Sequence, residues 1–238
     1  MLDVKGLSVR YGKHRALDDA ALSVGTSEIV VILGANGAGK STLLKAVAGL
    51  HPPGAGARVA LDDRELVGLP PHQIVEAGLA LVPEGRGIFA DLTVAENLLV
   101  AACFGQNKRE REVVDTVGEI LEQAGLSAKA NRVAGALPLL DRKRLEMARA
   151  LATNPRLLLL DEIAGGLTQG ECDELVETIR SIHRSGRTII WIEHIVNALV
   201  AVVSRLVVLN FGRIIAEGEP RTVLASSAVR EIYLGAPA

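Results

Sequence analysis

The stretch Gly34–Ser41 reads GANGAGKS and fits the phosphate-binding pattern GxxxxGK[ST]. An apolar run, Ile29–Leu33, precedes it and an apolar helical pattern follows it, which is the context this motif requires. The glycines Gly34, Gly37 and Gly39 let the backbone curl so that successive N–H groups can point at phosphate oxygens. An incidental glycine-rich turn would not need this context, so the stretch predicts an α/β protein that binds a nucleoside triphosphate.

The end of the motif carries the charged and metal-binding groups. Lys40 can neutralise the β- and γ-phosphates, and the Ser41 hydroxyl can be a ligand of Mg²⁺. The helix predicted from Lys40 to Leu50 adds its positive N-terminal end. The residues of this segment expected to contact ATP are Gly34, Asn36, Gly37, Gly39, Lys40, Ser41 and Thr42.

A second apolar run, Leu157–Leu160, ends in two carboxylates. Asp161, at the strand end, is expected to hold Mg²⁺ directly or through water. Glu162 is the expected general base for the attacking water. Many buried strands end in acidic turns, so this pattern gains its meaning from its pairing with the phosphate-binding motif.

The composition limits the possible partners. Lys and Arg total 26 against 28 Asp and Glu, for a formal net charge of -2. This balance gives no long-range attraction to nucleic acid, and an aromatic content of 3% argues against a base-stacking surface. The apolar fraction is 49%, yet no apolar run approaches the roughly 20 residues that span a membrane. The apolar excess therefore predicts buried strands of a parallel sheet.

The remaining patterns predict a sheet core with an inserted helical lobe. Strands are expected at 3–10, 16–24, 28–33, 80–82, 157–160, 188–192, 205–209 and 213–216. Helices are expected within 93–125, at 141–152 and 169–183, near 195–201, and within the tail 220–234. We expect a single domain, with a core of 1–83 and 155–238 and a helical subdomain of 84–154.

With these motifs, the chain resembles the ATPases of ATP-binding-cassette (ABC) transporters over essentially its whole length. Tyr11 lies where that family places an aromatic residue that stacks on adenine, and His194 lies where it places a histidine that contacts the γ-phosphate. The resemblance implies a P-loop fold of ABC type, with a mixed sheet core, an antiparallel β part and an inserted helical subdomain. It also implies binding and hydrolysis of MgATP in a head-to-tail dimer.

Other segments are similar to the ATPases of branched-chain amino-acid importers: Val82–Arg86, Leu92–Leu98 and Val229–Gly235. Glu84 stands where most ABC proteins have Gln, and the resemblance implies that it senses the magnesium and nucleotide site. The implied partners are transmembrane permease subunits, a second ABC ATPase subunit and, indirectly, a substrate-binding protein, with no nucleic acid. The implied location is cytoplasmic, on the inner face of the cell membrane.

Three positions depart from the family pattern. The signature Leu-Ser-Gly-Gly-Gln falls on Leu137–Asp141, which reads LPLLD, in a register fixed by the well-matched 142–149. The proline after the catalytic glutamate is Ile163, and the dimer-contact aspartate is Thr168.

We expect the altered signature to be a poor phosphate contact. Pro138 has no N–H, Leu139 and Leu140 add bulk, and Asp141 would bring a carboxylate toward a phosphate-bearing site. A homodimer of this chain should then hydrolyse ATP slowly, whereas a heterodimer with an ordinary cassette would contain one complete site.

Two alternatives to a transport ATPase stay open on these residues. The first is a regulatory ATP-binding partner in a heterodimeric complex. The altered signature favours it, and four intact residues oppose it: Lys40, Asp161, Glu162 and His194. The second is a soluble ABC ATPase without a transport role, which lacks support because the chain carries neither a long coiled coil nor a second cassette. The transported substrate is not encoded in these motifs.

Overall fold

A parallel sheet forms the centre of the fold, and the phosphate-binding turn leaves its middle strand. The computed structural model describes residues 1–85, 87–193, 203–227 and 229–230. Within them, the larger sheet has the strand order β10-β9-β3-β8-β7-β6. Its strands are β3 (Ile29–Leu33), β6 (Leu79–Val82), β7 (Leu157–Asp161), β8 (Thr188–Ile192), β9 (Arg205–Asn210) and β10 (Arg213–Gly218). Only the pairing of β10 with β9 is antiparallel among these described strands.

The central strands are covered on both faces. Every residue of β3, β7 and β8 is buried, which explains their continuous apolar sequences. The register places Asp161 beside Ile192, so β7 and β8 end at the same edge of the sheet. Ligands of open α/β sheets bind outside this carboxyl edge, and the phosphate-binding turn that follows β3 lies there.

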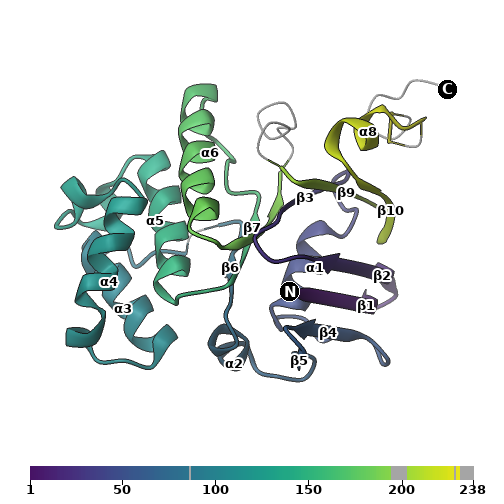
Figure 1. Cartoon of the computed structure of the whole chain (residues 1–238), viewed down its shortest axis with the longest axis horizontal. Helices are drawn as coiled ribbons and strands as arrows, with labels where there is room; N and C mark the ends of the chain where they lie inside the picture. Colours follow the sequence, from purple (N-terminus) through teal and green to yellow (C-terminus); the bar gives the residue numbers. More distant parts are fainter. Residues whose placement is uncertain (86, 194–202, 228, 231–238) are drawn as a thin grey trace.

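A smaller antiparallel sheet covers one face of the parallel sheet together with α1. Its order is β2-β1-β4-β5, with β1 (Leu2–Tyr11), β2 (His14–Val24), β4 (Arg58–Leu61) and β5 (Arg64–Glu65). Alternating residues of β1 and β2 share one apolar core with α1 (Lys40–Val47) and with one face of β3 and β7. The predicted antiparallel part is therefore present, and it lies beside the phosphate-binding turn (Figure 1).

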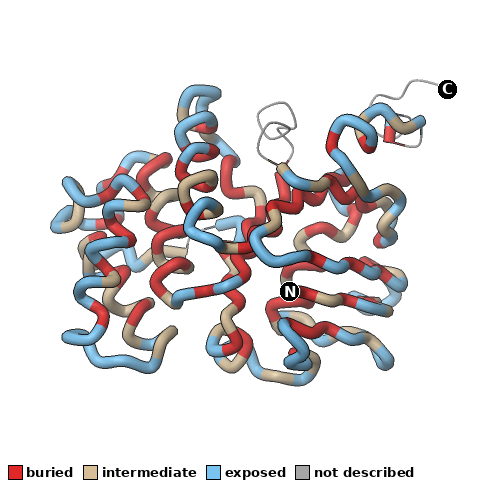
Figure 2. The backbone as a smooth tube through the Cα atoms, in the orientation of Figure 1, coloured by how far each residue is buried: buried red, intermediate tan, exposed pale blue. Residues whose placement is uncertain are grey.

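Helices cover the opposite face of the parallel sheet and form a lobe at one end of the molecule (Figure 1). They are α3 (Val94–Gln106), α4 (Glu110–Gln123), α5 (Leu139–Ala152) and α6 (Gln169–Arg184), with short η1 (Ser127–Lys129) and η2 (Ala134–Ala136). Figure 2 shows the buried segments running along the sheet and between these helices. Two further helices, α2 (Pro71–Glu76) and α8 (Pro220–Ala225), lie outside this lobe. Among the helices of the described ranges, none combines the length and apolar character needed to cross a bilayer.

Several predicted boundaries were wrong for local reasons. The helix from Lys40 ends at Val47 and not at Leu50, since Gly49 takes a left-handed φ of 71°. The helices expected within 93–125 are present as α3 and α4, and Asn107, with a φ of 52°, reverses the chain between them. The elements β4, β5 and α2 were not predicted. The helix expected near 195–201 and the tail beyond 230 lie outside the described residues.

Candidate nucleotide-binding site

The turn between β3 and α1 needs glycine at two points of close backbone approach. A Cβ on Gly34 would lie 2.4 Å from the carbonyl oxygen of Leu209. A Cβ on Gly39, which has a φ of 105°, would lie 2.4 Å from the carbonyl oxygen of Ala16. The turn is thus packed by its backbone against β9 on one side and β2 on the other, and side chains are excluded from both contacts.

Lys40 lies inside this turn and is 4% exposed. Its ammonium donates hydrogen bonds to the carbonyl oxygens of Gly34 at 2.9 Å and Ala35 at 3.2 Å. It also lies 3.8 Å from a carboxylate oxygen of Glu162. Burial lowers the pKa of Lys40, and the nearby Glu162 and Asp161 oppose this shift. The lysine is therefore a buried cation held at the mouth of the phosphate-binding turn.

Asp161 is fully buried beneath the turn, and the Ser41 hydroxyl donates to its Oδ1 at 2.9 Å. Its Oδ2 is buried without a hydrogen-bond partner among the described residues. Burial raises the pKa of Asp161, and Glu162 and Glu84 add to the rise, whereas Ser41 and Lys45 oppose it. A buried carboxylate oxygen without a partner, next to a hydroxyl, is an oxygen donor set that fits Mg²⁺.

The donor set is small, which matches how Mg²⁺ is usually held. In the described part of the chain, no three His, Cys, Asp or Glu side chains gather as a metal cage. Mg²⁺ commonly takes one or two protein oxygens and completes its shell with water and substrate phosphates. Ser41 and Asp161 could hold the ion in that way, and Glu84 and Ser41 line one surface cavity.

Glu162 has a φ of 48°, which is unusual for a residue with a side chain. Its backbone N–H donates to the carbonyl oxygen of Ile192 at 3.0 Å and so extends the ladder between β7 and β8 by one bond. The chain then leaves the sheet, and the Glu162 side chain reaches the hollow above Lys40. A strained backbone at a cleft is typical of functional residues.

These groups surround a hollow of about 400 Å³. It is lined by Tyr11, His14, Ala16, Asn36, Gly37, Gly39, Lys40, Ser41, Thr42, Glu84 and Glu162. Of the predicted site residues, Gly34 and Asp161 are buried behind this surface, and His194 lies outside the described residues. His14 lines the hollow but was not predicted to do so from the sequence. The signal was its position opposite Tyr11 in the β1–β2 hairpin. The roles of these residues stay predictions.

Tyr11 projects at the rim of the hollow. Its side chain is 45% exposed, and its ring meets the His51 ring edge-on, with centroids 5.2 Å apart. An exposed ring at the end of a strand, beside a phosphate-binding turn, is available to stack on a base.

The altered signature begins α5, and one expectation about it was wrong. Asp141 does not face outward: it is 3% exposed, and its carboxylate pairs with Lys129 at 2.5 Å and Arg144 at 3.8 Å. A carboxylate in the first turn of a helix is stabilised by the helix dipole, and two cations neutralise it here. The signature segment therefore presents Pro138 and Leu139, and repulsion from Asp141 is not part of its effect.

The other two departures have structural roles. Ile163 is fully buried and belongs to the apolar core. Thr168 begins α6 as its N-cap, with a reciprocal capping box to Glu171. Both residues are thus explained by packing and helix initiation.

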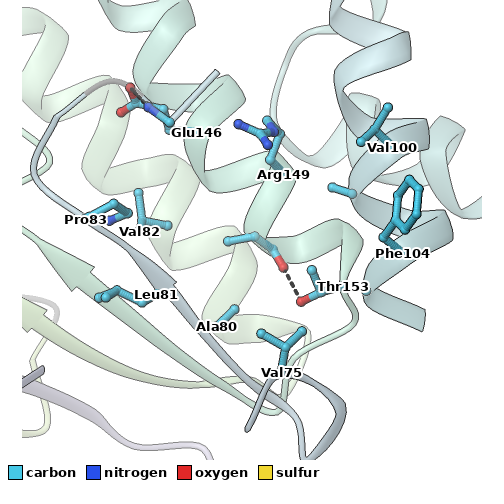
Figure 3. Close-up of a pocket in the computed structure, with 14 residues that line it drawn as sticks. Val75, Ala80, Leu81, Val82, Pro83, Val100, Phe104, Glu146, Arg149 and Thr153 are labelled. Atoms are coloured by element: carbon cyan, nitrogen blue, oxygen red, sulfur yellow. Dashed lines mark hydrogen bonds between the residues drawn. The ribbon is translucent and has the colours of Figure 1, made fainter. Parts of the chain in front are cut away.

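A second hollow, of about 360 Å³, lies between β6, α3 and α5 (Figure 3). Its apolar wall includes Val82, Val100 and Phe104, and the Phe104 side chain is 84% exposed. Arg149 from α5 also lines it, and its guanidinium lies 4.5 Å from the centre of the Phe89 ring. This groove starts at Pro83, directly before Glu84, so one loop borders both hollows.

Comparison with known families agrees with this geometry. Residues 17–165 match the family model described as ABC transporter. The chain belongs to the ABC transporter family. The predicted family and fold class are therefore confirmed, and the chain is an ABC ATPase.

Curated relatives of this ABC ATPase match along its whole length. It is 37% identical over 235 residues to the high-affinity branched-chain amino acid transport ATP-binding protein BraG of Pseudomonas aeruginosa, covering 99% of this chain and 100% of BraG. It is 35% identical over 252 residues to the protein LivG of Escherichia coli K12, which has the same description, covering 99% and 98%. The solved ADP conformation of MJ1267, an ATP-binding cassette of an ABC transporter, superposes with a TM-score of 0.90 at 29% identity, covering 99% of each chain.

Proposed function

We propose that this ABC ATPase powers the import of branched-chain or related amino acids. The observation that carries the catalytic part is the arrangement of two residue pairs at one hollow. The Ser41 hydroxyl bonds to the buried Asp161 at 2.9 Å, and Lys40 lies 3.8 Å from Glu162. The substrate class is supported by full-length similarity to BraG and LivG, whose names give branched-chain amino acid transport. Both relatives match from end to end, so the similarity is not confined to the shared nucleotide-binding motifs.

In the proposed reaction, each group has one task. Lys40 binds the β- and γ-phosphates, exchanging its bonds to the turn carbonyls for bonds to phosphate oxygens. Ser41 and Asp161 hold Mg²⁺, which supplies charge neutralisation at the phosphates when bound. Glu162 accepts a proton from the attacking water, and its position above Lys40 supports that role. Glu84 remains the proposed sensor of the magnesium and nucleotide site, and His194 the proposed catalytic residue that contacts the γ-phosphate.

We also propose that the working ATPase is a dimer with a second, different cassette. The start of α5 supports this pairing, since Pro138 offers no N–H and Leu139 packs toward Gly166 without a polar group. A partner with an intact Ser-Gly-Gly signature would complete the site at this chain's P-loop. The opposite site, facing this chain's signature, would turn over slowly.

The permease contact is proposed for the groove in Figure 3. Phe104 is exposed in this groove, and the groove reaches Pro83, directly before Glu84 of the nucleotide hollow. The division into a core of 1–83 and 155–238 and a helical subdomain of 84–154 is part of this proposal, because the groove lies where the two meet. The proposed location is the cytoplasmic face of the cell membrane, with a substrate-binding protein as an indirect partner.

The test is an uptake assay, with Glu162→Gln as a control that should bind ATP without hydrolysing it. The tagged chain is purified with its membrane partners, placed in liposomes containing ATP, and supplied with labelled leucine, lysine or glutamate through the cognate binding protein. We expect ATP-dependent uptake of leucine, and its loss in Glu162→Gln with ATP binding retained, since an amide cannot take the proton. Uptake of lysine or glutamate instead would refute the substrate class, whereas wild-type ATPase turnover in Glu162→Gln would remove Glu162 from the base role.

A further inference from the structure

A buried carboxylate at the end of β8 has no part in the reaction described so far. Glu193 is 4% exposed and directly follows Ile192, the residue aligned with Asp161 across the sheet. Burying a carboxylate is unfavourable unless it is well hydrogen-bonded. Its placement at the carboxyl edge of the sheet therefore calls for a structural or functional reason.

Glu193 holds the loop that carries Glu162. Its Oε1 accepts a hydrogen bond from the backbone N–H of Ala164 at 2.8 Å, in a buried position. Ala164 lies two residues after Glu162, and the Glu162 N–H bonds to Ile192. The end of β8 thus makes two hydrogen bonds to this loop, one through the Ile192 carbonyl oxygen and one through the Glu193 side chain.

The hydrogen bond from Ala164 to Glu193 matters because the loop begins with a strained backbone at Glu162. Glu162 adopts a left-handed φ of 48°, a conformation that a residue with a side chain keeps only when its surroundings enforce it. Beyond Ala164 the loop bonds to itself, from the Leu167 N–H to the Ala164 carbonyl oxygen at 3.2 Å. Without the Glu193 contact, the Ala164 N–H would be buried and unpaired, and the turn after Glu162 would lose its link to the sheet.

We propose that Glu193 is a positioning residue for hydrolysis, which fixes the Glu162 carboxylate over the P-loop by holding the Ala164 amide. This inference rests on the proposed role of Glu162 as the general base. The contact requires an acceptor oxygen at the full length of a glutamate side chain. Replacing Glu193 by Gln or by Asp therefore separates the effect of side-chain length from the effect of charge.

Glu193→Gln keeps the length and the acceptor oxygen, whereas Glu193→Asp keeps the charge and withdraws the oxygen by one methylene. In the membrane complex purified through this chain, we expect kcat within about twofold of wild type for Gln and at least about tenfold lower for Asp. ATP affinity should change by less than about threefold in both, because the P-loop contacts stay intact. If Glu193→Asp does not fold, Glu193→Ser, which leaves room for water, takes its place with the same expectation.

Glu28 offers a matched control at the opposite edge of the sheet. Its carboxylate accepts the Gly25 N–H at 2.8 Å and also pairs with Arg205 at 2.7 Å. Glu28 directly precedes β3, at the end of that strand away from the phosphate-binding turn. Glu28→Asp should lower the melting temperature and leave kcat unchanged. This control separates a loss of stability from a misplaced Glu162.

The outcomes distinguish this inference from the role of Glu162 itself. A full rate in Glu193→Asp, or a rate in Glu193→Gln as low as that of Glu193→Asp, would overturn the positioning role. In a Glu162→Gln background, Glu193→Asp should not lower the residual rate further, because its effect passes through Glu162. If Glu162→Gln alone leaves turnover unchanged, the proposed base is wrong, which is a separate result.

Discussion

Replacing Gly39 by alanine tests the packing of the phosphate-binding turn, and Gly37 supplies a matched control two residues away. Both glycines have a left-handed backbone, with φ of 105° and 79°. A Cβ on Gly39 would lie 2.4 Å from the Ala16 carbonyl oxygen and 3.0 Å from the Leu17 side chain. A Cβ on Gly37 meets no atom of the described structure within 4 Å. The two substitutions therefore share the backbone strain and differ in the collision.

The expected magnitudes follow from these two contributions. The left-handed conformation costs alanine about 1–2 kcal/mol, and this should be the whole loss for Gly37→Ala. Forcing a methyl group into a packed site adds about 1–3 kcal/mol, so Gly39→Ala should lose about 2–5 kcal/mol. The Ala16 carbonyl cannot simply move away, because Gly212 packs on it and also bonds to Asp18 and to Ala38 of the turn.

The assay is urea unfolding of the nucleotide-free protein, followed by circular dichroism. Working without nucleotide keeps any contact between the added methyl group and phosphate out of the comparison. Gly12→Ala, with a φ of 59° and open space around the added Cβ in the described structure, should match Gly37→Ala and not Gly39→Ala. Equal losses at Gly37 and Gly39 would refute the idea that β2 braces the turn.

Three further predictions concern the hollow itself. Lys40→Ala should weaken MgATP binding by about 1.5–3 kcal/mol, since it removes a charged donor to the phosphates, and an unchanged affinity by titration would contradict the P-loop assignment. Tyr11→Ala should weaken ATP binding by about 1–3 kcal/mol through lost stacking. An equal loss for inorganic triphosphate would show that Tyr11 acts through folding. Asp161→Asn should raise the melting temperature of the nucleotide-free protein near neutral pH, because burial raises the pKa of Asp161 above 3.8 and penalises its charged form. That gain should shrink as the pH falls through the raised pKa and vanish below 3.8, where the acid is neutral in both the folded and the unfolded protein. A lower melting temperature for Asp161→Asn at neutral pH would contradict the prediction.

The parts of the site that could be predicted from sequence depend on short-range patterns. The strand, turn and helix around Lys40 follow one another in the chain, so residue type and spacing were enough. The proximity of Asp161 to this turn was predictable because parallel strands end at a common edge, and the Ser41 hydroxyl indeed bonds to it. The family resemblance added Tyr11 and Glu84, which line the same hollow.

The parts that were missed depend on contacts between distant segments. The short strand β4 owes its place to pairing with β1, and 58–61 has too few residues to reveal that pattern alone. Asp141 looked exposed because a signature position was expected to face a partner. Its burial depends on Lys129, which lies on a 3₁₀ turn 12 residues earlier. The hydrogen bond from Ala164 to Glu193 spans 29 residues and joins the loop after β7 to the end of β8, which no local pattern encodes.

The site combines two kinds of support, and they should fail differently. The phosphate-binding turn is fixed by backbone packing, with Gly34 against Leu209 and Gly39 against Ala16. The carboxylate side is fixed by directed hydrogen bonds, from Ser41 to Asp161 and from Ala164 to Glu193. A collision in the packed half must be relieved by moving whole strands, so its cost falls on the free energy of unfolding. Loss of a hydrogen bond on the carboxylate side frees a single loop. It should therefore lower kcat through misplaced reacting groups, while the sheets stay intact.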